Sequence, residues 1–227
     1  MMKLVVLYPG AMKPFHDGHL SLLESYISNN DKIVPDTVHI IISPSERSGI
    51  TATTTEKFIK AIDFSKINKT CNIQIQVANA NPIVACYAIC GHCEDPDVHF
   101  TLASSEKGED TKRIDYFKSL FSEGGKYYNK NFPERVIDIN VDQKPLIYET
   151  RTDAYNYKPI SSTIVRYDIV NNDFDNFKAA YNYMLSKELI TESILMEYYN
   201  DLCDEVMLSK KDSKKLNDLL QESFKDK

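Results

Sequence analysis

Within residues 4–141, two patterns of apolar residues alternate along the chain. Short apolar runs, mostly β-branched, are typical of buried strands and occur at residues 4–7, 38–42, 73–77, 98–103 and 136–141. Between these runs, apolar residues recur at helical spacing and predict helices at residues 18–29, 54–62, 82–90 and 111–121. Strands alternating with helices predict an α/β fold, with a Rossmann-like parallel sheet and flanking helices.

From residue 160 onward the pattern is helical. A first helix is predicted to about residue 171, and apolar stripes follow at residues 174–184, 194–206 and 216–224. We therefore expect an α/β domain of residues 1–171 and a C-terminal helical extension, residues 172–227, packed on it. Stripes of this kind are typical of core packing or subunit contacts, so a homo-oligomer stays open.

A loop with two histidines joins the first predicted strand to the first helix. Gly10 and Pro14 break regular structure there. The backbone N–H groups at a helix start lack intrahelical partners and attract anions. His16 and His19 are spaced to face one anion, and Lys13 adds a cation suited to phosphate. No glycine-rich P-loop pattern occurs, so these residues predict a phosphate site with two imidazoles.

A second polar helix start follows at Ser161, Ser162 and Thr163. Hydroxyl side chains are preferred caps, and together with unpaired N–H groups they can hold phosphate oxygens. Arg166, one turn later, can bond two phosphate oxygens at once. Taken alone, the segment fits an ordinary cap followed by an exposed arginine. Beside the histidine loop, it favours phosphate binding.

These two segments carry a resemblance to a known family. His16-Asp17-Gly18-His19 resembles the H-x-G-H signature of the cytidylyltransferase-like nucleotidyltransferase superfamily, and residues 160–166 resemble its I-S-S-T-x-[IV]-R motif. The resemblance implies an enzyme in which an acceptor phosphate attacks the α-phosphorus of a nucleoside triphosphate and pyrophosphate leaves. It assigns His16, His19 and Lys13 to catalysis, with Mg²⁺ carried by the triphosphate and no metal site in the protein. The nucleotide-binding residues that it implies are Tyr8, Pro9, Gly10, Ala11, Gly18, Ile160, Ser161, Ser162, Thr163 and Arg166.

The acceptor and the base are less narrowly defined. The second motif is most similar to that of nicotinamide-mononucleotide adenylyltransferases, which implies ATP and nicotinamide mononucleotide as substrates and a role in NAD synthesis. Those enzymes commonly use a tryptophan on the acceptor side, and this sequence has none. We expect Tyr116, Phe117 or Tyr148 to stack on the acceptor instead. Arg47 and Ser104 are further acceptor candidates, because they lie in polar loops after predicted strands.

Three alternatives stay open. Two are a pantetheine-phosphate adenylyltransferase and a cytidylyltransferase for alcohol phosphates. The latter enzymes often carry an R-T-E-G-I-S-T-T string, whereas here Arg151-Thr152 is separated from Ile160. A nucleotide-sensing protein would keep the fold without turnover. Retention of both histidines, Lys13 and Arg166 favours an enzyme.

Composition narrows the class of partner. Lys and Arg total 27 against 33 Asp and Glu, a net charge of −6, which disfavours a general nucleic-acid or membrane-surface binder. No apolar run approaches the roughly 20 residues of a membrane span, and we expect no signal peptide. The expected partners are a nucleoside triphosphate and a small phosphorylated acceptor.

The cysteines indicate a compartment rather than a chemistry. Their number, five, is odd, and their spacing is not that of a disulfide framework, which favours a cytoplasmic protein. Cys90 and Cys93 have zinc-knuckle spacing and Cys86 lies one helical turn away. A structural zinc site usually needs four ligands. Buried or free thiols are therefore favoured, and metal binding stays open.

Overall fold

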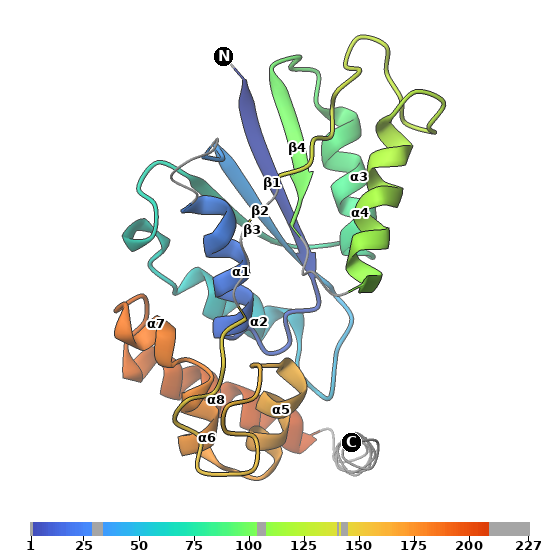
Figure 1. The fold of residues 1–227 in the computed structure, drawn as a ribbon. Helices are drawn as coiled ribbons and strands as arrows, with labels where there is room; N and C mark the ends of the chain where they lie inside the picture. Colours follow the sequence, from blue (N-terminus) through green and yellow to red (C-terminus); the bar gives the residue numbers. More distant parts are fainter. Residues whose placement is uncertain (1, 29–33, 104–107, 140, 142–144, 209–227) are drawn as a thin grey trace. The chain divides into compact units, whose positions relative to one another are not determined.

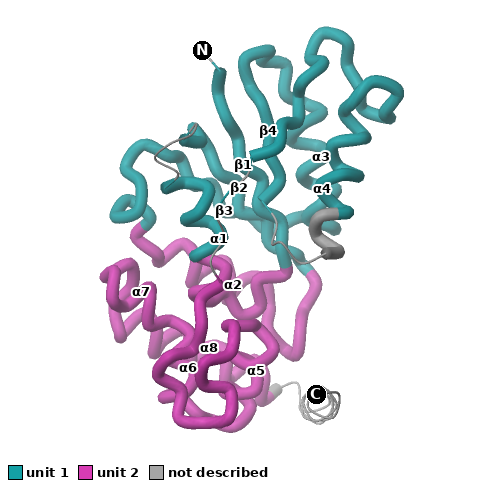
Figure 2. The backbone as a smooth tube through the Cα atoms, in the orientation of Figure 1, with its two compact units in different colours: residues 1–10, 21–44, 64–144 teal, residues 11–20, 45–63, 145–227 magenta. Residues whose placement is uncertain are grey.

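The computed structural model describes residues 2–28, 34–103, 108–139, 141 and 145–208 (Figure 1). Contacts within the chain divide it into two compact units, shown in Figure 2. Unit 1 comprises residues 1–10, 21–44 and 64–144, and unit 2 comprises residues 11–20, 45–63 and 145–227. The division does not fall between residues 171 and 172. Unit 2 instead combines the C-terminal helices with two segments from early in the sequence.

Unit 1 is built on a parallel sheet of four strands in the order β3-β2-β1-β4. Its strands are β1 (Lys3–Gly10), β2 (Thr37–Ile42), β3 (Asn72–Val77) and β4 (Val98–Leu102). In the centre of the sheet, Val6 of β1 pairs with Val38 on one side and Thr101 on the other. The predicted Rossmann-like α/β arrangement is confirmed. Because the strand order reverses at β1, right-handed crossovers place the two sets of helices on opposite faces.

Helices of unit 1 cover both faces of this sheet (Figure 1). On the first face are α3 (Pro82–His92) and α4 (Gly108–Phe121), and the rest of unit 1 includes a short 3-10 helix, Phe64–Lys66. On the second face lies the part of α1 (Asp17–Ile27) that follows residue 20. Asn81 caps α3 by accepting a hydrogen bond from Ile83 N at 2.8 Å, next to a proline at the first helical position.

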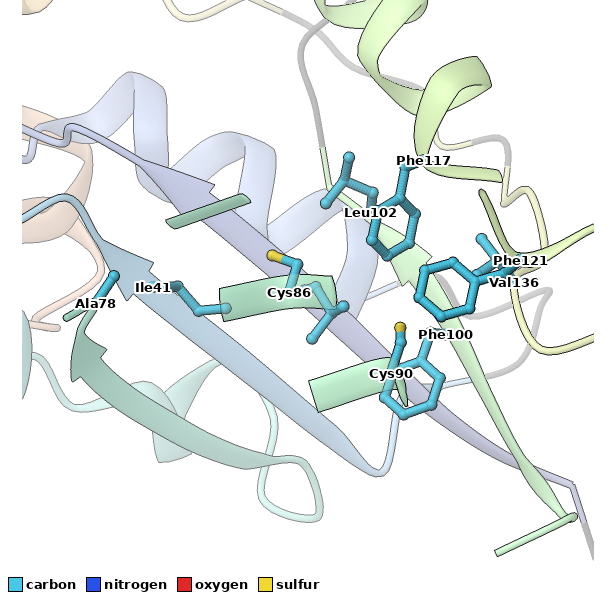
Figure 3. Packing of buried hydrophobic residues seen from close by; sticks show 10 residues of the cluster. Ile41, Ala78, Cys86, Cys90, Phe100, Leu102, Phe117, Phe121 and Val136 are labelled. Carbon is cyan, nitrogen blue, oxygen red and sulfur yellow. The ribbon is translucent and has the colours of Figure 1, made fainter. Parts of the chain in front are cut away.

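The core between the sheet and α3–α4 is made of apolar and sulfur-containing side chains (Figure 3). Its members are Leu7, Ile41, Ala78, Cys86, Cys90, Phe100, Leu102, Phe117, Phe121 and Val136. Burial raises the pKa of the Cys86 thiol to about 12 and that of Cys90 further, so both are apolar packing residues here. All five thiols are free. Within the described part of the chain, no group of three or more His, Cys, Asp or Glu side chains could hold a metal ion.

The strand predicted at residues 136–141 is wrong in extent. Val136 makes a single parallel bridge with Phe100, bounded by hydrogen bonds from Phe100 N to Arg135 O and from Ile137 N to Phe100 O, both 2.9 Å. Asp138 then pairs with Lys118 of α4. Among the described residues, the segment therefore adds one bridge beside β4 and not a fifth strand.

Unit 2 is helical. It contains α2 (Ala52–Lys60), α5 (Ser162–Val170), α6 (Phe174–Ala179), α7 (Asn182–Ser186) and α8 (Glu192–Leu208). Its core is aromatic: Phe58 stacks on Tyr198 with ring centroids 3.9 Å apart, and Phe177 contacts Tyr181 at 4.7 Å. The predicted stripe at residues 174–184 forms two short helices, α6 and α7, rather than one, and the stripe at residues 216–224 lies outside the described residues. None of the helices that the structure describes is both long and apolar enough to cross a bilayer.

Candidate functional site

Most of the predicted phosphate-binding residues belong to unit 2. The histidine loop, Arg47 and residues 160–166 all lie in its three segments. Tyr8, Pro9 and Gly10 do not: they form the end of β1, where Pro9 and Gly10 pair with β2, so the predicted loop begins only at Ala11. Pro9 is tolerated in this strand because it lies beyond the last residue, Leu7, that pairs with β4.

The two histidines form a reciprocal cap at the start of α1. The carbonyl of His16 accepts the first helical hydrogen bonds, from His19 N at 2.9 Å and Leu20 N at 3.2 Å. The His16 side chain accepts from Gly18 N through Nδ1 at 3.1 Å, and the His19 side chain accepts from His16 N through Nδ1 at 3.3 Å. This is the geometry of a capping box, with imidazoles in place of the usual serine and glutamate.

The cap fixes the tautomer of both rings. A ring nitrogen that accepts a hydrogen bond carries no proton, so each neutral imidazole must carry its proton on Nε2. The His16 Nε2–H then donates to Ser162 Oγ at 3.1 Å, and that hydroxyl donates onward to Pro14 O at 3.3 Å. The ring centroids of His16 and His19 are 4.0 Å apart. Capping and hydrogen-bond donation are therefore compatible roles of the same side chains.

Gly18 is required by this arrangement. A Cβ atom at this position would lie 3.0 Å from Cε1 and 3.1 Å from Nδ1 of His16, and 3.5 Å from the carbonyl oxygen of Ile160. The first two distances are shorter than nine in ten real Cβ contacts. A side chain at position 18 would therefore require the His16 ring to shift by a few tenths of an ångström.

Ser161 caps α5, as predicted, by accepting from Ile164 N at 3.4 Å. Arg166 of the same helix differs from the prediction, because its side chain is buried, with 7% of its surface exposed. Its Nη1 donates to Lys13 O at 2.7 Å and its Nη2 donates to Thr163 Oγ1 at 3.1 Å. Its Nε has no hydrogen-bond partner among the described residues. The helix turns this arginine toward the histidine loop rather than toward solvent.

Three cations gather around this loop. Lys13 is 1% exposed, and its ammonium group donates to Ser45 O. Burial, and then the positive charge of Arg47, lower the pKa of Lys13; the same two causes lower the pKa of Arg166 to about 10. Glu205 and Glu46 oppose the shift at Lys13. The residue before Lys13, Met12, has a φ of 55°, a costly conformation outside glycine that is concentrated at functional sites.

Two C-terminal helices, α8 and α7, make hydrogen bonds to the histidine loop. Tyr198 of α8 accepts a hydrogen bond from Phe15 N through its hydroxyl at 3.2 Å. The Asp17 carboxylate, 1% exposed, accepts from Tyr183 N at 2.6 Å and from Met184 N at 3.1 Å at the start of α7. Burial raises the pKa of Asp17 to about 7, although these N–H groups act in the opposite direction.

A second buried arginine was not singled out from the sequence. Arg151 forms a bidentate pair with Asp168, at 2.6 and 2.7 Å, and also donates to both carboxylate oxygens of Asp153 and to Asn176 O. Its guanidinium lies 4.6 Å from the ring centroid of Tyr148. The sequence signal was available in Asp168, a carboxylate on the apolar side of a predicted helix, which needs a cation when buried.

The predicted acceptor residues do not converge. Tyr148 is fully buried beneath Arg151 and Phe117 is fully buried in the core of unit 1, so neither ring has a free face for stacking. Tyr116 is 60% exposed on α4 of unit 1, Ser104 lies outside the described residues, and Arg47 is exposed in unit 2. Of the five, Arg47 is the one that interacts electrostatically with Lys13 and Arg166.

Comparisons with known proteins add little to this geometry. No protein-family model and no curated protein matches the chain. Among solved structures, Enterococcus italicus Csm6 bound to cyclic hexa-2'-fluoro-hexa-dAMP is similar with a TM-score of 0.33 and 14% sequence identity. The match covers 97% of this chain and 53% of that chain, so the chain spans about half the length of that protein. A TM-score this low carries no argument about the site.

Proposed function

We propose that the protein is a nucleotidyltransferase that transfers a nucleotidyl group from a nucleoside triphosphate to a phosphate-bearing acceptor. The observation that carries the proposal is the combination, within unit 2, of two Nε2–H imidazoles and three cations around one loop. A buried cation is costly without an anion. Among the described residues no carboxylate pairs with Arg166, so a phosphate chain would relieve this cost.

The proposed reaction needs positioning and charge stabilisation rather than a covalent intermediate. An acceptor phosphate oxygen forms a bond to the α-phosphorus while the bond from that phosphorus to the leaving pyrophosphate breaks. Nε2–H of His16 and His19 would donate to the oxygens on which charge develops. Lys13, Arg166 and Arg47 would bind the β- and γ-phosphates. In the absence of nucleotide Ser162 Oγ accepts the Nε2–H of His16, and this N–H would exchange the hydroxyl for a phosphate oxygen when the triphosphate binds.

Mg²⁺ fits this site as part of the triphosphate. The side chains assigned to phosphate binding are imidazoles, an ammonium and guanidinium groups, whereas Mg²⁺ prefers carboxylate and carbonyl oxygens. The nearby carboxylates of Glu205 and Glu46 act on Lys13. Oxygens of the triphosphate, rather than protein side chains, would therefore bind the ion. When bound, the ion would neutralise charge on the β- and γ-phosphates, and the residues named above would act on the remaining oxygens.

We propose ATP and nicotinamide mononucleotide as the first substrates to test, because the second motif is most similar to that of the adenylyltransferases that use them. The test is an assay of pyrophosphate release in the presence of Mg²⁺. It combines ATP or CTP with each of several phosphorylated acceptors. We expect release with ATP and nicotinamide mononucleotide. Release with CTP and an alcohol phosphate, or with ATP and phosphopantetheine, would replace these substrates but keep the reaction class. No release with any pair, while ATP still binds, would favour a nucleotide-sensing protein.

A further inference from the structure

We propose that Asp17, the variable residue of the H-x-G-H segment, is a positioning residue that sets the orientation of both imidazoles from helices α6 and α7. Residues 180–184 would then help to position the catalytic histidines, in addition to packing on the rest of unit 2. The kinetic part of the proposal rests on the proposed function. Its spectroscopic part does not.

Asp17 is held by the C-terminal segment at three points. Its backbone N–H donates to Ala180 O at 3.0 Å, Oδ2 accepts from Tyr183 N at 2.6 Å, and Oδ1 accepts from Met184 N at 3.1 Å. Both carboxylate oxygens are thus engaged by the backbone about 166 residues later, in a side chain that is 1% exposed. Such a group fixes its own backbone position, because each hydrogen bond has narrow distance and angle requirements.

The place of Asp17 in the helix makes this restraint important. Asp17 is the first residue of α1, between His16, which caps the helix, and Gly18, whose N–H bonds the His16 ring. A shift of the backbone at residue 17 would therefore move the donor that His16 accepts from and the helical turn that carries His19. Tyr198 restrains residue 15 on the other side. His16 is thus held between two anchors, both of which come from C-terminal helices.

The hydrogen bonds of Asp17 connect the starts of two helices, α1 and α7. α6 begins with its own local cap, Asp173, which accepts from Asn176 N at 3.0 Å and from Asn176 Nδ2 at 2.7 Å. α7 has no side-chain cap of its own at Tyr181. Asp17 supplies that cap from a distant part of the chain. The start of α7 and the start of α1 are therefore fixed by the same carboxylate.

The experiment compares Asp17→Ala and Asp17→Asn with Asp173→Asn, a matched control that alters a helix-capping carboxylate of the same unit away from the histidines. All are made in the full chain. The first measurement is the imidazole nitrogen chemical shifts of ¹⁵N-histidine-labelled protein, assigned with His16→Asn and His19→Gln. The second is kcat and KM for ATP in the pyrophosphate assay, with the melting temperature recorded for each variant.

In the wild type we expect both rings as the Nε2–H tautomer. In Asp17→Ala we expect both to exchange between tautomers, with kcat lower by about tenfold or more and KM for ATP within about twofold, because misplacement by an ångström is enough for such losses. Asp17→Asn keeps one acceptor oxygen and should be intermediate. Asp173→Asn should lower the melting temperature without changing the rings or kcat.

Unchanged ring signals and unchanged kcat in a folded Asp17→Ala would overturn the proposal and leave Asp17 as a cap for α7 alone. Should Asp17→Ala not fold, the same comparison between Asp17→Asn and Asp173→Asn decides. If the wild type releases no pyrophosphate, the proposed function fails. The ring signals then test the positioning role alone: tautomer exchange in the Asp17 variants supports it, and unchanged rings overturn it.

Discussion

Unit 2 contains two buried arginines with opposite surroundings. Arg151 uses all of its N–H donors on Asp168, Asp153 and Asn176 O. Burial alone would lower its pKa, but the two carboxylates more than offset this and raise it. Arg166 bonds only a carbonyl and a hydroxyl among the described residues, and burial followed by the charge of Arg47 lowers its pKa to about 10. Arg151 is thus satisfied by its own chain, whereas Arg166 is suited to an anion from solution.

The largest expected effect is on stability and comes from replacing Arg151. Arg151→Met leaves Asp168, 1% exposed, without its cation, and breaking such a buried pair typically costs about 3–5 kcal/mol of unfolding free energy. Urea denaturation measures this loss. The double variant Arg151→Met with Asp168→Leu should recover most of it, since apolar replacement of a buried pair is often neutral. A loss below about 1 kcal/mol in the single variant would place this pair with weak surface pairs.

The second largest expected effect is on turnover and comes from removing the imidazole N–H donors of His16 and His19. His16→Asn and His19→Gln keep a side-chain acceptor for the cap and remove the Nε2–H donor. We expect each to lower turnover about a hundredfold, near 3 kcal/mol, with little change in stability. His16→Ala should lose the same turnover and about 1 kcal/mol of stability as well. Near-normal turnover in the first two variants would mean that the histidines serve the fold only.

Arg166→Lys has the third largest expected effect. A lysine cannot copy the planar fork, so we expect the KM for ATP to rise by about tenfold. Because Arg166 is buried, the stability should also fall, by about 1 kcal/mol for the lost hydrogen bonds. The KM and the melting temperature are measured together. An unchanged KM with a lower melting temperature would make Arg166 a structural residue like Arg151.

The smallest expected effect is on the pH dependence of the unfolding free energy. It comes from the carboxylate of Asp17. Asp17 has a pKa raised from 3.8 to about 7, so the folded chain binds its proton more readily than the unfolded chain. Its stabilising contribution is complete below about pH 4 and is lost as the pH rises toward 7. Asp17→Asn should reduce the slope of unfolding free energy by at most about 1.4 kcal/mol per pH unit. An identical slope in the variant would contradict the raised pKa.

Local patterns predicted the sheet well and the site only in part. The apolar runs identify the four strands of the sheet, because short β-branched runs bounded by turn residues are typical of buried parallel strands. The polar starts of α1 and α5 were also visible in the sequence. The burial of Arg166 was not, because it depends on a contact with Lys13, which is 153 residues away. The burial of Tyr148 was not visible either, because Arg151, which covers its ring, is itself held by Asp168 and Asn176 from later helices. The role of Asp17 was hidden for the same reason, since its partners are backbone N–H groups, which carry no sequence signal.

The interleaving of unit 2 has a consequence for synthesis. Residues early in the chain form hydrogen bonds with residues made much later: Phe15 with Tyr198, and Asp17 with Tyr183. The Thr51 hydroxyl likewise donates to the Glu205 carboxylate at 2.7 Å. A ribosome adds about 5–20 residues per second, so the early segments remain without these partners for roughly ten seconds or more. The strands β1–β4 are complete much earlier in the chain. A nascent chain can therefore form its sheet while the histidine loop is still unassembled, and the loop gains its anchors only when first α7 and then α8 emerge.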